Sequence, residues 1–330
     1  MSISCTSQSS HSIRHRSRCF LSCRRNMAAR FTDAVVAQRY ALFRPHYPES
    51  LLNGILNFVT RPTKSRTSTP NAGVAPRAVA ANDLNLVDVG CGSGQSTFFL
   101  AKAGFKEIHG IDTSQAQIAE ARKALEKQDS SACDRVEFKI VDVDRDIPFR
   151  DGSVDIITAA QALHWFNHDQ FYKHVDKALK PGGFFMGFGY GNCQVLHNGV
   201  QGLLGEFYGG KLGKYWSPER RHIDTLYNNM PMPYKPVERL SLELQYDVTL
   251  AHLIGYISSW SAYATYCLEH PSNTVLEDLE KQMIEAIKSS AVGASKSGDK
   301  PTQSENNVKD HVLGIRFPIF ALMCRKPDGQ

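Results

Sequence analysis

Three closely spaced glycines mark the segment of this chain whose residues are best suited to hold a ligand. The segment, DVGCGSGQ at 88–95, follows a short apolar run, and its Gly90, Gly92 and Gly94 carry no Cβ that would keep a bound molecule away from the backbone. A loop of this kind typically binds a nucleotide-like ligand, although the same glycines could form only a packing turn. Their spacing is GxGxG, which differs from the GxGxxG of dinucleotide-binding folds.

Two carboxylates follow the glycine loop along the chain. Asp112 stands at the end of the next expected strand, roughly 20 residues after the loop, where a carboxylate can accept hydrogen bonds from both hydroxyls of an adenosine ribose. Enzymes that bind NAD place an acid there too. Asp142, in VDVDRDIPF at 141–149, distinguishes NAD-binding enzymes from proteins that bind another adenosine-containing ligand. Its position after the third strand lets its side chain reach the adenine amino group, while the backbone of Val143 faces a ring nitrogen.

His164 and Trp165 follow the fourth expected strand, at the edge of the sheet where ligands of open α/β folds bind. His164 is therefore a candidate substrate contact and a candidate general base. The alternative is structural, since the tryptophan could seal the core while the histidine bonds to a backbone carbonyl.

The elements that would position these residues alternate between strands and helices. Strands are expected at 84–89, 107–111, 136–141, 154–159 and 183–189, with helical patterns from 97, at 114–127 and at 169–179. This alternation predicts βαβ units and a parallel sheet covered on both faces. A later strand at 239–248, helices near 252–267 and 274–288, and a final strand at 312–324 follow.

Three aromatic residues, Tyr256, Trp260 and Tyr263, recur at i, i+4 and i+7 within the first of these later helices. This spacing predicts a single helix face. The face would line an acceptor pocket or pack on the sheet, and packing is the favoured interpretation.

Composition divides the chain into six segments. They are an Arg/Ser-rich extension at 1–32, helices at 33–60, a linker at 61–83, the α/β core at 84–190, a cap insertion at 191–238, and a C-terminal part at 239–330 with a low-complexity loop at 291–307. The extension holds six arginines and no acid, which is typical of a mitochondrial transit peptide. Because Met27 could instead begin the functional protein, mitochondrial import and a cytoplasmic location both stay open.

Bulk properties exclude several classes of protein. The 330 residues are 42% hydrophobic, yet no apolar run is long enough to span a bilayer, so no membrane partner is expected. The formal net charge of +5 comes from the N-terminal extension, and the near-neutral remainder has no basic stripe for nucleic acid. The eight cysteines form no CxxC pair, so no metal site is expected. The oligomeric state is not readable.

The chain resembles class I S-adenosylmethionine-dependent methyltransferases, in the branch that includes trans-aconitate methyltransferases. The matching segments are YALFRPHYPESL at 40–51, DVGCGSGQST at 88–97, GIDTSQAQI at 110–118, IPFRDGSVDIITAAQALHWFN at 147–167 and LKPGG at 179–183. The resemblance covers about residues 31–190 and is looser from 191 onward. It implies a doubly wound, mostly parallel sheet of seven strands, with an irregular or helical cap inserted after the fifth strand.

The resemblance also implies a role for each matching residue. The methionine part of S-adenosyl-L-methionine would be lined by Asp88, Gly90, Cys91 and Gly92, and Gly94 would complete the cofactor-binding loop. Asp112 and Thr113 would bind the ribose, and Asp142 and Val143 would face adenine. Gln161 would close the pocket beside the sulfonium. Tyr40 and Arg44 would belong to an N-terminal lid on the substrate side, together with Trp165.

The implied activity is methyl transfer by in-line displacement to a small-molecule acceptor, with small carboxylic acids suggested by family analogy. A carboxylate acceptor would need no general base, whereas a hydroxyl or an amine would, and His164 is then the nearest candidate. One alternative is a non-catalytic cofactor-binding protein that acts as an assembly or regulatory partner. Another, an NAD-dependent oxidoreductase, is disfavoured by the GxGxG spacing and by the Asp142 loop.

Overall fold

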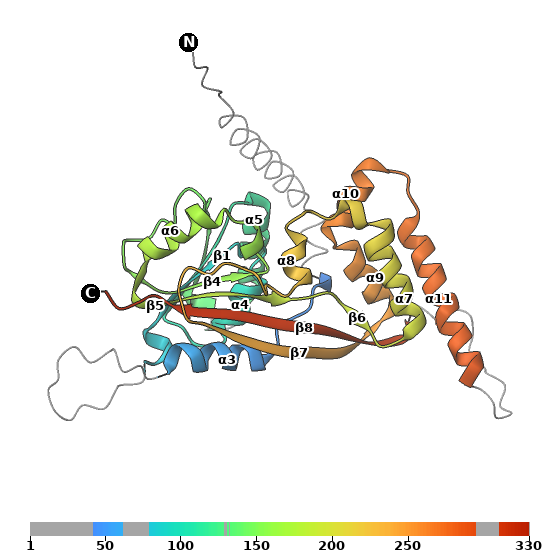
Figure 1. Cartoon of the computed structure of the whole chain (residues 1–330), viewed down its shortest axis with the longest axis horizontal. Helices are drawn as coiled ribbons and strands as arrows, with labels where there is room; N and C mark the ends of the chain where they lie inside the picture. The colour runs from blue at the N-terminus through green and yellow to red at the C-terminus, as the bar shows by residue number, and fades with distance from the viewer. Residues whose placement is uncertain (1–41, 62–78, 129–130, 132, 295–309, 330) are drawn as a thin grey trace, which may run out of the picture.

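A twisted sheet runs through the centre of the molecule (Figure 1). The computed structural model describes residues 42–61, 79–128, 131, 133–294 and 310–329. The strands are β1 (Asn85–Val89), β2 (Glu107–Asp112), β3 (Val136–Ile140), β4 (Val154–Ala160), β5 (Leu179–Tyr190), β6 (Gln194–Val195), β7 (Val237–Thr249) and β8 (Val312–Arg325). The order is β3-β2-β1-β4-β5-β8, and β7 pairs with the free edge of β8.

The first five strands run parallel, and β8 lies antiparallel between β5 and β7. The doubly wound, mostly parallel sheet predicted from the sequence is thereby confirmed. The strand beyond the expected seven is the two-residue β6, which pairs with the same edge of β8 as β5 does. Every residue of β4 is buried, as expected for a central parallel strand covered on both faces.

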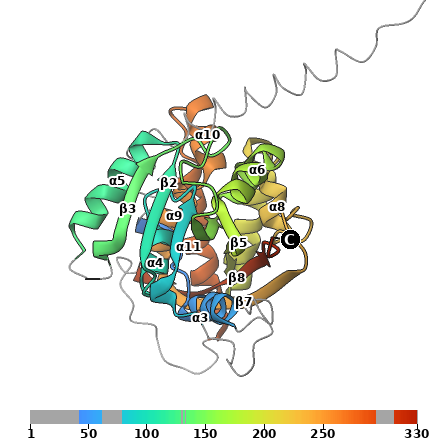
Figure 2. The same cartoon turned by 90° about the vertical axis from the view of Figure 1, so that its left-hand side faces the viewer.

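Helices cover the sheet on both faces (Figure 2). One face packs against α3 (Glu49–Thr60), α4 (Gln95–Ala101) and α5 (Gln115–Glu126), and the other against α6 (His168–Ala178) and α8 (Arg220–Asp224). The helix α3 follows Pro48 and buries Leu51, Leu52 and Ile55 on one side, which is the apolar stripe of an amphipathic helix. Short 3₁₀ turns at Ala81–Asp83, Cys133–Arg135 and Leu163–Trp165 join these elements.

Residues 191–238, the expected cap, are mainly helical. After β6 they form α7 (Asn198–Glu206), a π-helix at Phe207–Lys211, a 3₁₀ turn at Gly213–Tyr215 and α8. In Figure 1, α7 gathers with α9 (Leu250–Ser258), α10 (Ser261–Glu269) and α11 (Val275–Ala294) at the end of the molecule away from α6. The cap helix α7 thus joins the C-terminal helices in one helical cluster, whereas the cap helix α8 packs on the same face of the sheet as α6.

The single helix expected near 252–267 is wrong, because the chain breaks between α9 and α10. Trp260 is the N-cap of α10 and has an extended backbone. Tyr256, Trp260 and Tyr263 therefore do not share one helix face. Tyr256 and Trp260 are buried and meet edge to face, with ring centroids 5.6 Å apart, so for these two the packing interpretation is confirmed.

Several predictions lie outside the described residues. They are the N-terminal extension at 1–32, Tyr40, most of the linker at 61–83 and most of the loop at 291–307. Among the residues that the structure does describe, no helix is both long and apolar enough to cross a membrane.

Candidate functional site

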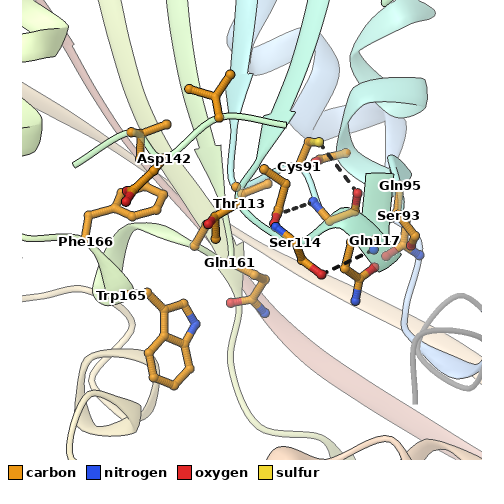
Figure 3. Close-up of a pocket in the computed structure, with 18 of the residues that line it drawn as sticks. Cys91, Ser93, Gln95, Thr113, Ser114, Gln117, Asp142, Gln161, Trp165 and Phe166 are labelled. Carbon is orange, nitrogen blue, oxygen red and sulfur yellow. Dashed lines mark hydrogen bonds between the residues drawn. The ribbon is translucent and has the colours of Figure 1, made fainter. Parts of the chain in front are cut away.

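A cavity of about 260 Å³ opens at the carboxyl ends of β1, β2 and β4 (Figure 3). Its lining comes from the glycine loop, the start of α4 and of α5, the ends of four further core strands and the segment before α3: Tyr47, Gly90, Cys91, Gly92, Ser93, Gln95, Ser96, Asp112, Thr113, Ser114, Gln117, Val141, Asp142, Val143, Asp144, Ala160, Gln161, Ala162, Trp165, Phe166 and Tyr190. Eight of the ten residues predicted to bind the cofactor line this one cavity, all except Asp88 and Gly94.

Each glycine of the loop has a positive φ, but the three have different surroundings. A Cβ on Gly90 would lie 2.6 Å from Ala162 Cβ, and one on Gly94 would lie 2.8 Å from the Phe138 ring, so both positions are closed by packing. A Cβ on Gly92 would meet only Gln117 Oε1, at 3.8 Å. Gly92 is therefore the glycine whose missing side chain leaves room for a ligand, whereas Gly94 does not line the cavity.

Asp88 does not line the cavity, contrary to the sequence prediction. Its side chain is fully buried beneath the loop and accepts hydrogen bonds from the hydroxyls of Ser96 at 2.6 Å, Thr97 at 2.7 Å and Thr158 at 2.8 Å. Burial raises the pKa of this carboxyl, and the three hydroxyl donors oppose the rise. Asp88 thus holds β1, α4 and β4 together and shapes the loop from below.

Asp112 does face the cavity, at the end of β2. Its Oδ2 accepts the backbone N–H of Gly92 at 2.9 Å, and its Oδ1 accepts that of Ser114 at 2.8 Å. Burial raises the pKa of the carboxyl, while the backbone N–H groups around it oppose that rise. Because each oxygen has one further lone pair, the carboxylate is held ready to accept two more donors.

The segment after β3 forms the opposite wall, as Figure 3 shows for Asp142. Val143 is buried, and Asp142 Oδ1 accepts the backbone N–H of Asp144 at 3.2 Å. Asp144 Oδ1 in turn accepts the backbone N–H of Asn167 at 3.1 Å, which links this wall to the loop after β4. The wall is therefore a rigid turn that presents both a carboxylate and backbone groups.

Gln161 directly follows β4 and has φ 52°, a left-handed conformation that is unfavourable for a residue other than glycine. Its Nε2 donates to the Tyr190 carbonyl at 2.8 Å, and its Oε1 is buried without a hydrogen-bond partner among the described residues. The side chain lines the cavity between Ala160 and Ala162. Strain of this kind is maintained where the backbone must aim a side chain at a site.

His164 does not line the cavity, so the prediction that it contacts substrate or acts as a base has no support in the structure. The ring is buried and its Nδ1 lies 2.7 Å from the hydroxyl of Tyr227, a residue of the cap. Burial, together with the nearby cation Arg220, lowers the pKa of His164 well below its usual range. Trp165, its neighbour in the chain, is the residue that faces the cavity.

The depressed pKa of His164 predicts a pH-dependent stability. Below about pH 6.5 the unfolded chain takes up a proton at this residue and the folded chain does not, so the unfolding free energy falls by up to about 1.4 kcal/mol per pH unit. His164→Asn, which can keep a bond to Tyr227, should lose this dependence. Urea unfolding at pH 7.5, 6.5 and 5.5 measures it, with exposed His311→Asn as the control. Equal pH slopes in the wild type and His164→Asn would contradict the assignment.

Arg44 lies behind the cavity wall rather than on it. Its Nη2 donates to the Ser259 carbonyl at 2.9 Å, and its Nη1 lies 3.5 Å from the hydroxyl of Tyr190, which does line the cavity. The guanidinium also sits 5.5 Å from the centroid of the Tyr256 ring. A cation is thus held next to the Tyr190 end of the site.

Several lining residues were not among the predicted site residues, and Tyr47, Gln117, Phe166 and Tyr190 are the larger ones. Tyr47 lies in the matching segment 40–51, but sequence spacing alone did not single it out as a site residue. Phe166 and Gln117 belong to matching segments whose side-chain directions depend on the fold. Among the described residues, no group of three or more His, Cys, Asp or Glu is placed to hold a metal ion.

Comparisons with known proteins agree with this geometry. A family model described as a methyltransferase domain matches residues 87–187. A Dictyostelium discoideum protein named as a methyltransferase is 30% identical over 243 residues, which cover 73% of this chain and 81% of that protein. The trans-aconitate 2-methyltransferase of Variovorax paradoxus is 35% identical over 100 residues, which are 30% of this chain and 35% of that enzyme.

A solved structure described as a type II methyltransferase, from Anaeromyxobacter dehalogenans, superimposes with a TM-score of 0.60 at 25% identity. The likeness covers 87% of this chain and all of that one. The glycine loop, Asp112 and the Asp142 turn surround one cavity, and the relatives are methyltransferases. Together these findings exclude the NAD-dependent oxidoreductase alternative and give S-adenosylmethionine as the cofactor. The chain belongs to the class I S-adenosylmethionine-dependent methyltransferases.

Proposed function

We propose that this enzyme transfers the methyl group of S-adenosylmethionine to the carboxylate of a small organic acid. The observation that carries the proposal is the guanidinium of Arg44, held beside the Tyr190 end of a cavity whose described lining contains no histidine and no lysine. Such a site attracts an anion and has no obvious group to remove a proton from a neutral acceptor.

The cavity has features that fit the cofactor. Gly92 leaves the loop open, and Asp112 offers free lone pairs for the two ribose hydroxyls. Asp142 and the backbone at Val143 would take the adenine end, which leaves Cys91 and Gly92 for the methionine part and Gln161 for the sulfonium end. When bound, the cofactor supplies an electrophilic methyl group whose departing thioether needs no proton.

The ionisable groups of the described lining argue against a general-base mechanism. Burial raises the pKa of the Cys91 thiol well above its usual range, so the thiol stays protonated at neutral pH. The acids Asp142 and Asp144 lie on the adenine wall, away from the acceptor end. A carboxylate acceptor is already a nucleophile at neutral pH and requires no such base.

The protein's contribution to this reaction is position. Trp165, Tyr47 and Tyr190 would enclose the acceptor and exclude water, and the charge of Arg44, behind Tyr190, would attract its carboxylate. Holding a nucleophile in line at about 3–3.5 Å from the reacting carbon can lower the barrier by several kcal/mol. The likeness to trans-aconitate 2-methyltransferase in the core region supports an acid as acceptor.

A labelled-methyl screen tests the proposal. The protein is incubated with S-adenosylmethionine that carries a labelled methyl group and with a panel of small carboxylic acids, each paired with its amide. We expect transfer to at least one acid and none to its amide. Mild alkali should then release the label as methanol, because esters hydrolyse in alkali whereas N-methyl and ether products do not. Alkali-stable products alone would overturn the carboxylate proposal.

A further inference from the structure

Gln117 carries a polar atom that the described part of the protein leaves without a partner. The residue is 95% buried, at 5% exposure, in the first turn of α5, and it lines the cavity. Its side-chain oxygen Oε1 is buried and accepts no hydrogen bond from any described residue. An unsatisfied buried carbonyl costs roughly 1–3 kcal/mol, so a glutamine at a position that Leu or Met could fill calls for a partner.

The local geometry places this oxygen at the ribose end of the site. The helix α5 is capped by Ser114, whose Oγ accepts the backbone N–H of Gln117 at 3.3 Å. Ser114 is also one of the two backbone donors to Asp112, and Gly92 is the other. A Cβ on Gly92 would lie 3.8 Å from Gln117 Oε1, so the amide faces the open side of the glycine loop.

Figure 3 shows Gln117 close to Ser114 and on the other side of the pocket from Asp142. Gln117 therefore belongs to the side of the pocket formed by the glycine loop and the start of α5, not to the wall formed by Asp142. The cofactor groups that belong beside Asp112 and Gly92 are the two ribose hydroxyls, and both are hydrogen-bond donors that need acceptors.

We infer that Gln117 is a further cofactor-binding residue, whose Oε1 accepts a hydrogen bond from a ribose hydroxyl of S-adenosylmethionine. Asp112 has one lone pair left on each oxygen after its bonds to Gly92 and Ser114. Gln117 adds an uncharged acceptor next to this carboxylate. Asp112 and Gln117 together would recognise the two neighbouring hydroxyls of the ribose. This inference rests on S-adenosylmethionine as the cofactor and is independent of the proposed acceptor.

The test is a binding cycle with S-adenosylhomocysteine and its 2′-deoxy and 3′-deoxy forms, measured by calorimetry on the full chain. Gln117→Met keeps the length of the side chain and removes the acceptor. We expect this variant to bind S-adenosylhomocysteine about 3- to 10-fold more weakly, as for one uncharged hydrogen bond. The wild type should bind S-adenosylhomocysteine more tightly than the deoxy form that lacks the hydroxyl bound by Gln117. In Gln117→Met this preference should shrink by a similar factor, because the variant no longer binds that hydroxyl.

Gln115→Met, an exposed change two residues earlier on the same helix, should leave all three affinities unchanged. Thermal unfolding without ligand checks that both variants fold. Unchanged affinity in Gln117→Met would overturn the inference, and so would equal weakening of all three ligands, which indicates a packing role. A wild-type protein that binds none of the three would instead refute the cofactor assignment.

Discussion

Asp112→Asn is expected to weaken the binding of S-adenosylhomocysteine by about 100-fold. The carboxylate faces the cavity, and both of its oxygens are oriented by backbone N–H groups, from Gly92 and Ser114. Each hydrogen bond from a ribose hydroxyl to a charged acceptor contributes about 1.5–3 kcal/mol, so losing the charge at two such bonds gives an effect of this size. Asparagine keeps one acceptor oxygen but places an amide donor against a backbone donor.

The two backbone bonds mean that Asp112 also stabilises the fold. The carboxylate is partly buried and joins the glycine loop to the start of α5 through these bonds. We therefore expect Asp112→Asn to lower the unfolding free energy by about 1–2 kcal/mol. Calorimetric titration at a temperature where the variant is folded separates the two effects, with exposed Asp151→Asn as the control. Wild-type affinity in Asp112→Asn would exclude this residue from the ribose site.

Arg44→Met is expected to lower kcat/KM for the acid found in the labelled-methyl screen by about 10- to 100-fold, mainly through KM. Because the guanidinium lies behind the wall, it would act on the acceptor through its charge and by orienting the Tyr190 hydroxyl. A 10- to 100-fold effect corresponds to about 1.4–2.8 kcal/mol, and methionine fills a similar volume without the charge. Binding of S-adenosylhomocysteine should change little, because Arg44 lies at the Tyr190 end and not along the ribose or adenine walls. Steady-state kinetics and calorimetry on the same preparation measure both quantities.

Two further variants separate charge from packing at this position. Arg44→Lys keeps the positive charge and should recover part of the lost kcat/KM, whereas a purely structural role through Ser259 would give no such recovery. Arg61→Met removes an arginine whose partner is the exposed Glu238, and it should leave the kinetics unchanged. An acceptor KM that is the same in Arg44→Met and the wild type would remove Arg44 from the acceptor site.

Much of the core could be predicted from the sequence because the signals are local. The run Leu84–Val89 is mostly apolar, with Leu84, Leu86, Val87 and Val89, as expected for a central strand of an α/β sheet, and the glycines that follow can adopt the positive φ that the turn needs. Asp112 and Asp142, predicted from the sequence to bind the cofactor, both line the cavity because they lie at the carboxyl ends of parallel strands, which meet at one edge of the sheet.

Whether a given side chain points into the cavity or away from it could not be predicted in this way. Asp88 and His164 belong to the matching segments, yet both turn away from the cavity, one toward three hydroxyls under the loop and the other toward Tyr227. Tyr227 is 63 residues from His164 in the chain. No local pattern shows which far partner a buried polar group will find.

The sequence by itself therefore determined the glycine loop and the alternation of parallel strands with helices, because these rest on backbone conformation and on the alternation of apolar runs. The class of cofactor followed from the resemblance of the matching segments to the methyltransferase family. The tertiary structure alone decided which side chains face the cavity. It brought Tyr47 and Tyr190 into the cavity lining, left an oxygen of Gln117 without a described partner, and placed Arg44 behind Tyr190. These positions depend on contacts between segments far apart in the chain, which have no signal in residue spacing.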